Sequence, residues 1–268
     1  MSILRPNGQD LPDVQSSSDD RAVAIDRVGV SHVRHPATVI DIDGTSQPVA
    51  ATFCMTVSLP PEAKGTHMSR FLQVLSDHHE ALGPGRLDEL VADLRTTLGA
   101  DIAQVDMEFP WFVRKEAPIT GEVGSIEYKV AIGIEAGPGE NVRRFLTVTT
   151  AATSLCPCSK EISSFGAHNQ RCELRARVES TEPIGITELG RRLESAASCE
   201  VYSVLKRPDE KHVTEAAYDN PKFVEDIIRD LALDLESDDR IVFFRINSEN
   251  FESIHGHNAW AEIERDRR

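Results

Sequence analysis

The sequence has no run of about 18 or more apolar residues, the length that a membrane-spanning helix requires. Its first residues also lack the basic, apolar and small-residue order of a secretory signal. Positive charge is in deficit, since 29 Lys and Arg face 44 Asp and Glu and the formal net charge is -15. Broad binding to nucleic acid or to an anionic membrane needs a positive surface, so we expect neither as a partner. The sequence therefore predicts a cytoplasmic protein.

Cysteines number only five, an odd count that cannot pair completely, and reducing compartments keep thiols free. A disulfide framework is thereby excluded, and core packing, metal ligation or nucleophilic chemistry is left. Three of them, Cys54, Cys172 and Cys199, lie in predicted strands or helices and are interpreted as structural. With 40% hydrophobic and 27% charged residues, the chain suits one large globular domain or two small ones.

The first half of the chain opens on a polar stretch, residues 1–22, which shows no apolar periodicity and predicts a flexible N-terminal arm. After it, β-branched and alternating residues predict strands, and apolar residues three to four apart predict helices. In chain order these are strands at 25–42 and 48–59, helices at 67–82 and 86–100, and strands at 101–117 and 125–137. The order is β-β-α-α-β-β.

The second half predicts the same order. The expected elements are strands at 143–155 and 169–181, helices at 186–205 and 221–236, and strands at 239–250 and 257–265. Asn220 and Pro221 are expected to cap and open the second of these helices.

Repetition of one element order predicts an α+β protein of two modules, residues 23–139 and 140–268. Each module would pack its helices on one face of an antiparallel sheet. The other face and the edge strands also need cover, and closing sheets into a barrel across subunits would supply it. We therefore expect a homo-oligomer.

The segment SLCPCSKEISSFGAHNQR, residues 154–171, places two cysteines and a histidine in a polar connection between two predicted strands. A thiolate and an imidazole suit zinc or another borderline divalent ion, and a catalytic site needs three protein ligands with one position open to water. Judged from the residues alone, such a cysteine and histidine can equally be packed core groups. A Cys156–Cys158 redox pair is disfavoured, because Cys-Pro-Cys would close a strained ring.

This segment, together with LPPEAKGTHMSRF at 59–71 and ENFESIHGHNAWA at 249–261, resembles the type IB GTP cyclohydrolases. The matching runs lie in both halves and so cover nearly the whole chain after the N-terminal arm. The resemblance implies two tandem tunnelling-fold modules, a homotetramer, and conversion of GTP and water to 7,8-dihydroneopterin 3'-triphosphate and formate. That reaction opens folate and related pterin biosynthesis.

The resemblance also implies a catalytic divalent metal, zinc, manganese or iron, held by a cysteine, a histidine and a glutamate. The matching positions are Cys156, His168 and Glu210, with Asp209 as the neighbouring alternative to Glu210. Opening the guanine imidazole ring requires water to add at C8, and a bound divalent ion can lower the pKa of water to about 7. Cys156 is accordingly counted among the catalytic residues.

Hydrolysis of the formyl amide that follows needs a general acid/base, a role that suits histidine near neutral pH. His255 is our candidate and His257 the alternative, since residues two apart in an extended run point to the same side. By resemblance, Glu252 is the acidic companion of this histidine. Either histidine can also be a structural residue with its hydrogen bonds satisfied, and Glu252 can be a surface loop residue.

Two further groups are expected to bind the substrate. The resemblance implies one carboxylate that accepts adjacent N–H groups of guanine, and Glu225 matches it, with Asp226 as the rival. Lys64, His67 and Arg70 lie at the start of the first predicted helix, where backbone N–H groups and the helix dipole favour anions. They are candidates for binding phosphate or a neighbouring subunit, and an ordinary capped helix start is the alternative.

Two other functions remain open. A related cyclohydrolase could form a pterin with a cyclic phosphate, and a regulatory protein could bind metal or purine without turnover.

Overall fold

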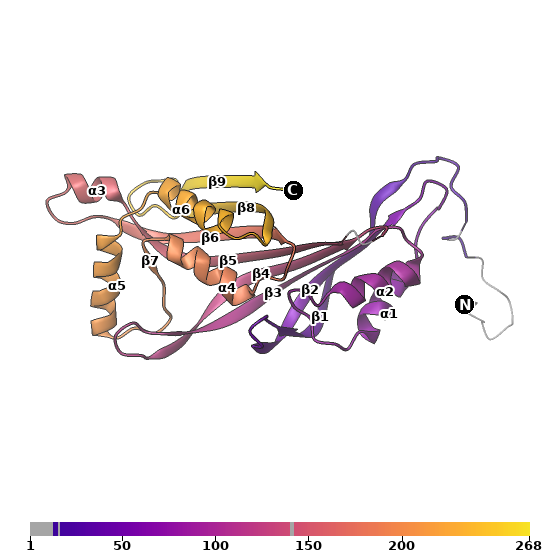
Figure 1. The fold of residues 1–268 in the computed structure, drawn as a ribbon, viewed down its shortest axis with the longest axis horizontal. Coiled ribbons are helices and arrows are strands. Elements are labelled where there is room, and N and C mark those ends of the chain that lie inside the picture. Colours follow the sequence, from indigo (N-terminus) through magenta and orange to yellow (C-terminus); the bar gives the residue numbers. More distant parts are fainter. Residues whose placement is uncertain (1–12, 16, 140–141) are drawn as a thin grey trace.

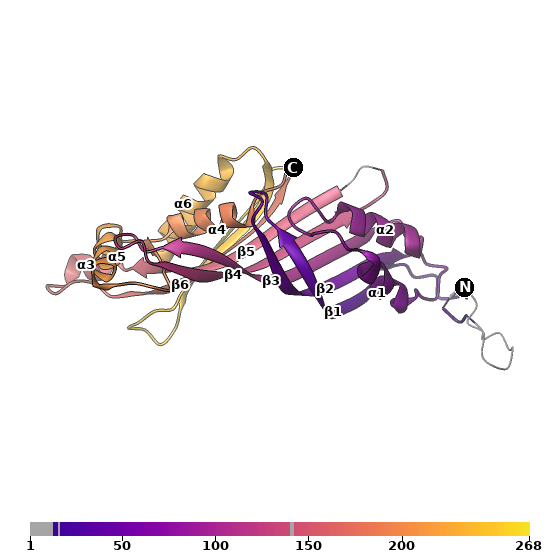
Figure 2. The ribbon, with the colours of Figure 1, turned by 90° about the horizontal axis from the view of Figure 1, so that it is seen from below.

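The computed structural model describes residues 13–15, 17–139 and 142–268, and these form one nine-stranded antiparallel sheet (Figure 1). Its main path runs β1-β2-β3-β4-β5-β6-β8-β9, and the two-residue β7 pairs with β5. Figure 2 shows the strands of both halves side by side along the length of the molecule. The strands are β1 (Ile25–Ile40), β2 (Ser46–Leu59), β3 (Ala103–Glu116), β4 (Val123–Ala136), β5 (Val142–Leu155), β6 (Asn169–Ser180), β7 (Cys199–Glu200), β8 (Ile241–Asn250) and β9 (Ala259–Asp266).

Four helices pack on the sheet and two lie near its end. The helix α2 packs on β2, β3 and β4, α1 on β1, α4 on β5 and β6, and α6 on β8 and β9. In Figure 1, α3 and α5 lie at one end of the elongated molecule and α1 and α2 toward the other. The helices are α1 (Met68–Asp77), α2 (Asp88–Leu98), α3 (Pro157–Ile162), α4 (Ile186–Ala196), α5 (Arg207–Asp219) and α6 (Val224–Glu236).

Alternation along the strands separates an apolar face from a polar one. In β3, Val105, Met107 and Trp111 are buried beneath the helices, whereas Glu108 and Pro110, which alternate with them, are exposed. Successive strand residues point to opposite faces, so the helix-covered face holds the core and the other face is polar. One contiguous hydrophobic core runs through both halves.

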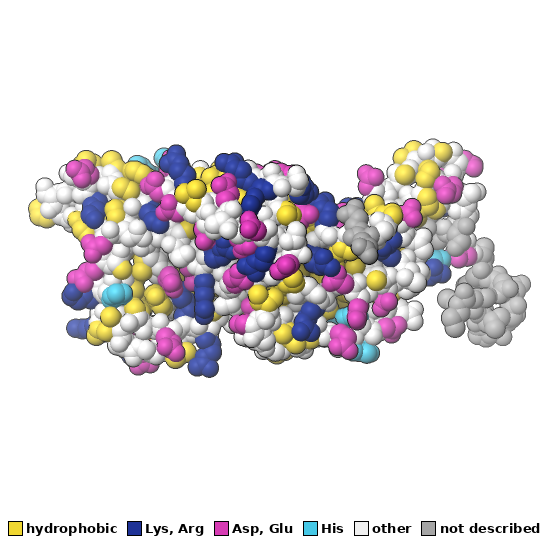
Figure 3. All heavy atoms as spheres, viewed as in Figure 1, with side chains coloured by type: hydrophobic (Ala, Val, Ile, Leu, Met, Phe, Trp, Pro, Cys, Tyr) yellow, Lys and Arg dark blue, Asp and Glu magenta, His cyan; other side chains and the backbone are white. Residues whose placement is uncertain are grey.

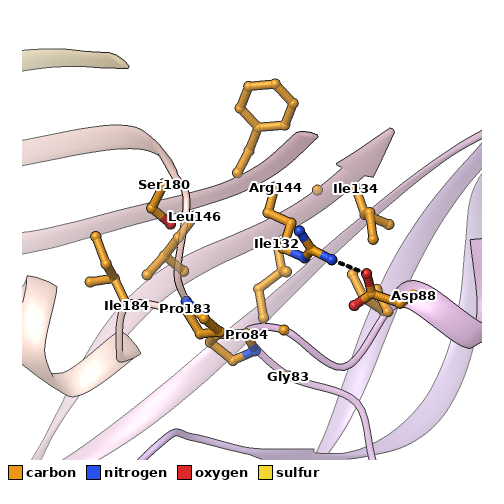
Figure 4. A pocket seen from close by; sticks show the side chains of 14 residues that line it. Gly83, Pro84, Asp88, Ile132, Ile134, Arg144, Leu146, Ser180, Pro183 and Ile184 are labelled. Atoms are coloured by element: carbon orange, nitrogen blue, oxygen red, sulfur yellow. Dashed lines mark hydrogen bonds and ion pairs between the residues drawn. The ribbon is translucent and has the colours of Figure 1, made fainter. Parts of the chain in front are cut away.

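The two halves join through the pairing of β4 with β5, which begins at Ala136 and Val142. On the helix side, Figure 4 shows Arg144 reaching Asp88 at the start of α2 in an ion pair. Beside it, a Cβ on Gly85 would lie 2.6 Å from the Pro183 ring, and Gly85 has a φ of +72°. Glycine is therefore required where the two helical layers meet.

The expected α+β class and the order β-β-α-α-β-β in the first half are confirmed. The second half contains these elements together with α3, β7 and α5, which the sequence analysis did not predict. Two details were wrong. The helix expected at 186–205 ends at Ala196, because the chain turns to pair β7 with the end of β5. The helix expected from Pro221 begins at Val224, because Asn220 ends α5 and its amide donates to the carbonyls of Ala197 and Ser198.

Part of the expected flexible arm at 1–22 contacts the first half, and its residues 1–12 and 16 lie outside the described residues. The backbone N–H of Lys64 donates to Ser17, and that of Asp19 donates to Glu62. The expected module boundary at 139/140 falls between the end of β4 and the start of β5, and residues 140–141 also lie outside the described residues. Over the described ranges, no helix is long and apolar enough to cross a membrane. The cytoplasmic location stays a prediction.

Candidate active site

The candidate site lies where β5 ends and β6 begins, at the end of the sheet that carries α3. Cys156 is the N-cap of α3, and Pro157 occupies the first helical turn, where its missing N–H costs nothing. The Cys156 Sγ accepts the Ser159 N–H at 3.4 Å. The Cys156 N–H donates to the His168 carbonyl at 3.1 Å, and the His168 N–H donates to the Ser159 Oγ at 3.1 Å. These hydrogen bonds hold Cys156 and His168, the predicted cysteine and histidine ligands, next to each other.

The His168 ring is held by its Nδ1. This atom lies 2.9 Å from Gln170 Oε1, 3.4 Å from Ser253 Oγ and 3.9 Å from Glu252 Oε2. Because an amide oxygen only accepts, Nδ1 carries the proton, and the lone pair is on Nε2. Histidines that ligate metals commonly show this arrangement, with one ring nitrogen donating to an outer group and the other binding the ion.

Gln170 connects the site to the buried end of the sheet. Its Nε2 donates to Ser154 Oγ at 3.4 Å and to Glu252 Oε1 at 3.5 Å, and Asn250 donates to the same Ser154 Oγ at 2.9 Å. Ser154, Gln170 and Asn250 are all buried. Sequence analysis singled out none of these three. Only the position of Gln170, two residues after His168 at the start of a predicted strand, could have indicated it.

Asp209 and Glu210, the alternatives for the third metal ligand, lie in the first turn of α5 and have different surroundings. The Asp209 carboxylate is buried and accepts the N–H groups of Ile119, Thr120 and Lys206 and the Thr120 hydroxyl, at 2.6 to 2.9 Å. Burial by itself would raise its pKa, but these hydrogen bonds outweigh it and hold the pKa below its usual range. Asp209 is therefore committed to structure, and the exposed Glu210 is the available carboxylate.

Glu210 is not brought to Cys156 in this arrangement. The contact between α5 and α3 is at the far end of α5, where Lys160 donates to the Tyr218 carbonyl and lies 4.2 Å from the Tyr218 ring centroid. Tyr218 lies eight residue steps along the helix from Glu210, a rise of about 12 Å. Throughout the described part of the chain, no three His, Cys, Asp or Glu side chains are grouped to hold a metal ion. Cys156 and His168 are two side chains of the kind that bind divalent metals, and no described carboxylate joins them in such a group.

The start of α6 lies beside the site and carries both candidates for the purine-binding carboxylate, Glu225 and Asp226. Their surroundings differ. The Lys222 N–H donates to the Leu155 carbonyl at 3.0 Å, next to Cys156. Asp226 accepts the Phe223 N–H at 3.0 Å and so caps α6, whereas Glu225 is exposed. Glu225, the predicted purine anchor, is thus the carboxylate open to a ligand.

The predicted acid/base residues lie in the loop between β8 and β9. The rings of His255 and His257 stack at a centroid distance of 5.3 Å, and both residues are exposed. Glu252 from the same loop contacts His168 and Gln170, so this loop closes one side of the site.

The residues predicted to bind phosphate are far from this site within one chain. Lys64, His67 and Arg70 lie at the start of α1, toward the opposite end of the molecule from α3 (Figure 1). His67 is the N-cap of α1, and its Nε2 lies 3.2 Å from an Asp13 carboxylate oxygen. A role for these residues at the site around Cys156 would require a second copy of the chain.

Comparison with known proteins identifies the family. The model of the type I GTP cyclohydrolase FolE2 family matches residues 11–261. The chain is 48% identical to the GTP cyclohydrolase FolE2 of Nitrosomonas eutropha, over 97% of each chain. It is also 48% identical to a second protein of that name from Cupriavidus metallidurans, over 96% of each. The chain belongs to the FolE2 family. The resemblance to type IB cyclohydrolases is thereby confirmed.

Solved structures with the same fold have little sequence in common with this FolE2 chain. Uricase from Arthrobacter globiformis superposes with a TM-score of 0.53 at 9% identity, covering 90% of this chain and 93% of that one. Urate oxidase from Bacillus sp. TB-90 gives a TM-score of 0.50 at 8% identity, covering 91% and 100%. These similarities concern the fold alone, an antiparallel α+β arrangement that resembles the tunnelling fold.

The three cysteines of this FolE2 chain outside the Cys-Pro-Cys segment fit a structural role. Cys172 on β6 is fully buried, and burial raises the pKa of its thiol to about 12. Burial also raises the thiol pKa of the partly buried Cys54 and Cys199. A raised pKa keeps a thiol protonated and unreactive near neutral pH.

Proposed function

We propose that this chain converts GTP and water to 7,8-dihydroneopterin 3'-triphosphate and formate. Family membership over nearly the whole chain is the observation that carries the proposal. The geometry agrees with it, since a thiol, an oriented imidazole and two uncommitted carboxylates occur at Cys156, His168, Glu210 and Glu225. Neither a cyclic phosphate product nor a purely regulatory role is favoured by any of these observations.

The site takes a divalent metal, with Cys156, His168 and Glu210 as its ligands and zinc, manganese and iron as the candidate ions. Two features of the chain support this assignment. The proton on His168 Nδ1 faces Gln170, which directs Nε2 toward an ion, and the Cys156 thiol is only partly buried and lies at the N-cap of α3, where its backbone bonds to that of His168. When bound, such an ion acts as a Lewis acid and makes water nucleophilic near neutral pH.

The residues of the chain orient the guanine and move protons. Glu225 accepts adjacent N–H groups of the guanine ring and so sets which ring edge faces Cys156. Gln170 and Glu252 fix the His168 ring and compensate positive charge that develops on it. His255 supplies and removes the proton when the formyl group leaves as formate.

A homo-oligomer, with four copies as the family resemblance implies, completes the site. Exposed apolar side chains surround the site in a single chain, and Figure 3 shows hydrophobic groups at the end that carries α3. They include Ile162, Phe165, Phe251, Ile254 and Trp260. A rim of this kind is typical of a surface that a partner covers. A second copy would also bring its own Lys64, His67 and Arg70 to the triphosphate.

The test is formate release from GTP by chelated protein to which zinc, manganese or iron is restored. We expect metal-dependent turnover in the wild type and a loss of about 100-fold or more in Cys156→Ala, because outer ligand partners alone are worth about 10 to 100-fold. Cys158→Ala is the matched control, since this exposed thiol makes no hydrogen bond to another described residue, and it should keep its activity.

Folded protein that binds metal and GTP but releases no formate with any of the three ions would contradict the proposal. It would favour the regulatory alternative. Formate release with a cyclic phosphate pterin as product would instead identify the related cyclohydrolase reaction.

A further inference from the structure

An arginine-lined pocket of about 410 Å³ lies on the helix-free face of the sheet, far from the candidate active site. Strand ends from both halves form it. Its charged lining consists of five arginines and two glutamates, Arg27, Arg143, Arg177, Arg245, Arg268, Glu135 and Glu264. This excess of positive groups is unusual in a chain with a net charge of -15.

Four of the five arginines have a carboxylate of their own. Arg143 forms two hydrogen bonds with Glu179 at 2.9 and 3.0 Å. Arg27 lies 3.2 Å from Asp106. Arg245 and Arg268 pair with Glu264 and Asp266, respectively. Arg177 is the fifth, and no ion pair joins it to any carboxylate in the described ranges.

Two other arginines, Arg245 and Arg143, lie beside Arg177. In the β6–β8 ladder it lies directly opposite Arg245, and like charges in that position destabilise a sheet. Arg177 and Arg143 also share one aromatic ring, with their guanidinium carbons 4.5 and 5.0 Å from the Phe145 centroid. The ring face attracts both cations but carries no net charge, and of these three arginines Arg177 is the one without a carboxylate partner in the described ranges.

We propose that this pocket binds a phosphate-bearing anion, centred on Arg177. Guanidinium groups bind phosphate oxygens through paired N–H donors, and a multiply charged tetrahedral anion can accept from several of them at once. Such an anion supplies the negative charge that Arg177 lacks. Phe145 orients two of the guanidinium groups toward it.

The pocket is separate from the candidate active site. Phe145 lies near the start of β5 and Cys156 directly follows its end, so Cys156 is 11 residue steps of extended chain, or about 36 Å, from Phe145. An anion bound at Arg177 therefore does not contact the atoms that react in GTP. The inference goes beyond the proposed function and does not depend on it.

Calorimetric titration of the metal-free protein with inorganic phosphate, at constant ionic strength against chloride, tests the proposal. We expect saturable binding that is weakened at least about tenfold in Arg177→Gln, since a charge-assisted hydrogen bond is worth about that factor. Arg175→Gln is the matched control, because it removes the same charge from the same face of β6 outside the pocket. Its affinity should change less than about threefold.

Thermal melting in phosphate-free, low-salt buffer gives an independent result. Removing Arg177 relieves its repulsion with Arg245, so Arg177→Gln should melt at or above the wild-type temperature and gain nothing from added phosphate. ATP titrations distinguish the source of the anion. Binding tighter than that of phosphate and dependent on Arg177 assigns a nucleotide, and equal binding assigns free phosphate. No saturable phosphate binding by the wild type, or equal binding by Arg177→Gln, would overturn the proposal.

Discussion

Glu225 and Asp226 are neighbours at the start of α6, but only one of them is free to meet a substrate. Asp226 accepts the Phe223 N–H, whereas Glu225 is exposed beside the end of β5. Glu225→Gln should lower kcat/KM for GTP about 100-fold, or roughly 3 kcal/mol, because the new amide places a donor against the N–H groups of guanine. Steady-state formate release at several GTP concentrations measures it.

The control for this change is Asp226→Asn. It should lower the free energy of unfolding by about 0.3 to 1 kcal/mol, because the carboxylate charge at the start of α6 is lost, and leave kcat/KM nearly unchanged. Equal losses of activity in the two variants would remove Glu225 from the purine-binding role.

At the scale of residues, sequence could identify the groups with distinctive chemistry but not those that hold them. Cys156 and His168 occur in a recognisable motif, and the structure brings them together. Gln170 and Asn250 are ordinary polar strand residues, and their role depends on strands β6 and β8 being neighbours. Such contacts between distant segments leave no local pattern.

The helix α5 depends on one buried carboxylate for its position. Asp209 accepts backbone N–H groups from the β3–β4 turn and from the start of α5, and so links the two segments. These hydrogen bonds hold its pKa below the usual value. A depressed pKa in the folded state stabilises the protein above the unfolded value of 3.8, and this stabilisation is lost as the pH falls below it. Asp209→Asn should therefore melt at a lower temperature than the wild type at pH 7, and the gap should narrow below pH 4.

Thermal melts of both proteins from pH 7 to pH 3 measure this effect. The Glu210→Gln variant is the control, since its carboxylate is exposed and its melting temperature should follow the wild type throughout. A constant gap between Asp209→Asn and the wild type across this range would show that ionisation of Asp209 does not stabilise α5.

Elements with a clear apolar period could be predicted, and those held by polar contacts could not. The β3 residues alternate between buried and exposed, so the strand was expected. In α5 only Asp209 and Ala217 are buried, so RPDEKHVTEAAYD shows no apolar stripe for prediction to detect. The two-residue β7 is too short to show a pattern of its own, so the helix predicted at 186–205 included it.

The whole molecule presents two open sheet edges, β1 and β9, each paired on one side within the described chain. Unpaired edges favour strand addition, and barrel closure between copies would satisfy them. Trp260 on β9 is an exposed apolar residue at such an edge, with 58% of its surface accessible. Trp260→Lys should therefore reduce the oligomer toward the 29.6 kDa monomer and reduce GTP turnover with it, because a site shared between copies is lost.

Light scattering after size-exclusion chromatography, with formate release on the same fractions, measures both effects. Leu233→Lys provides the matched control, since Leu233 is equally apolar and exposed but lies on α6 rather than on an edge strand. It should keep the wild-type mass and activity. A wild-type mass of one chain with full turnover would exclude barrel closure as a requirement for catalysis. An unchanged mass in Trp260→Lys would place the interface elsewhere, leaving β1 and the exposed apolar rim around α3 as the remaining surfaces.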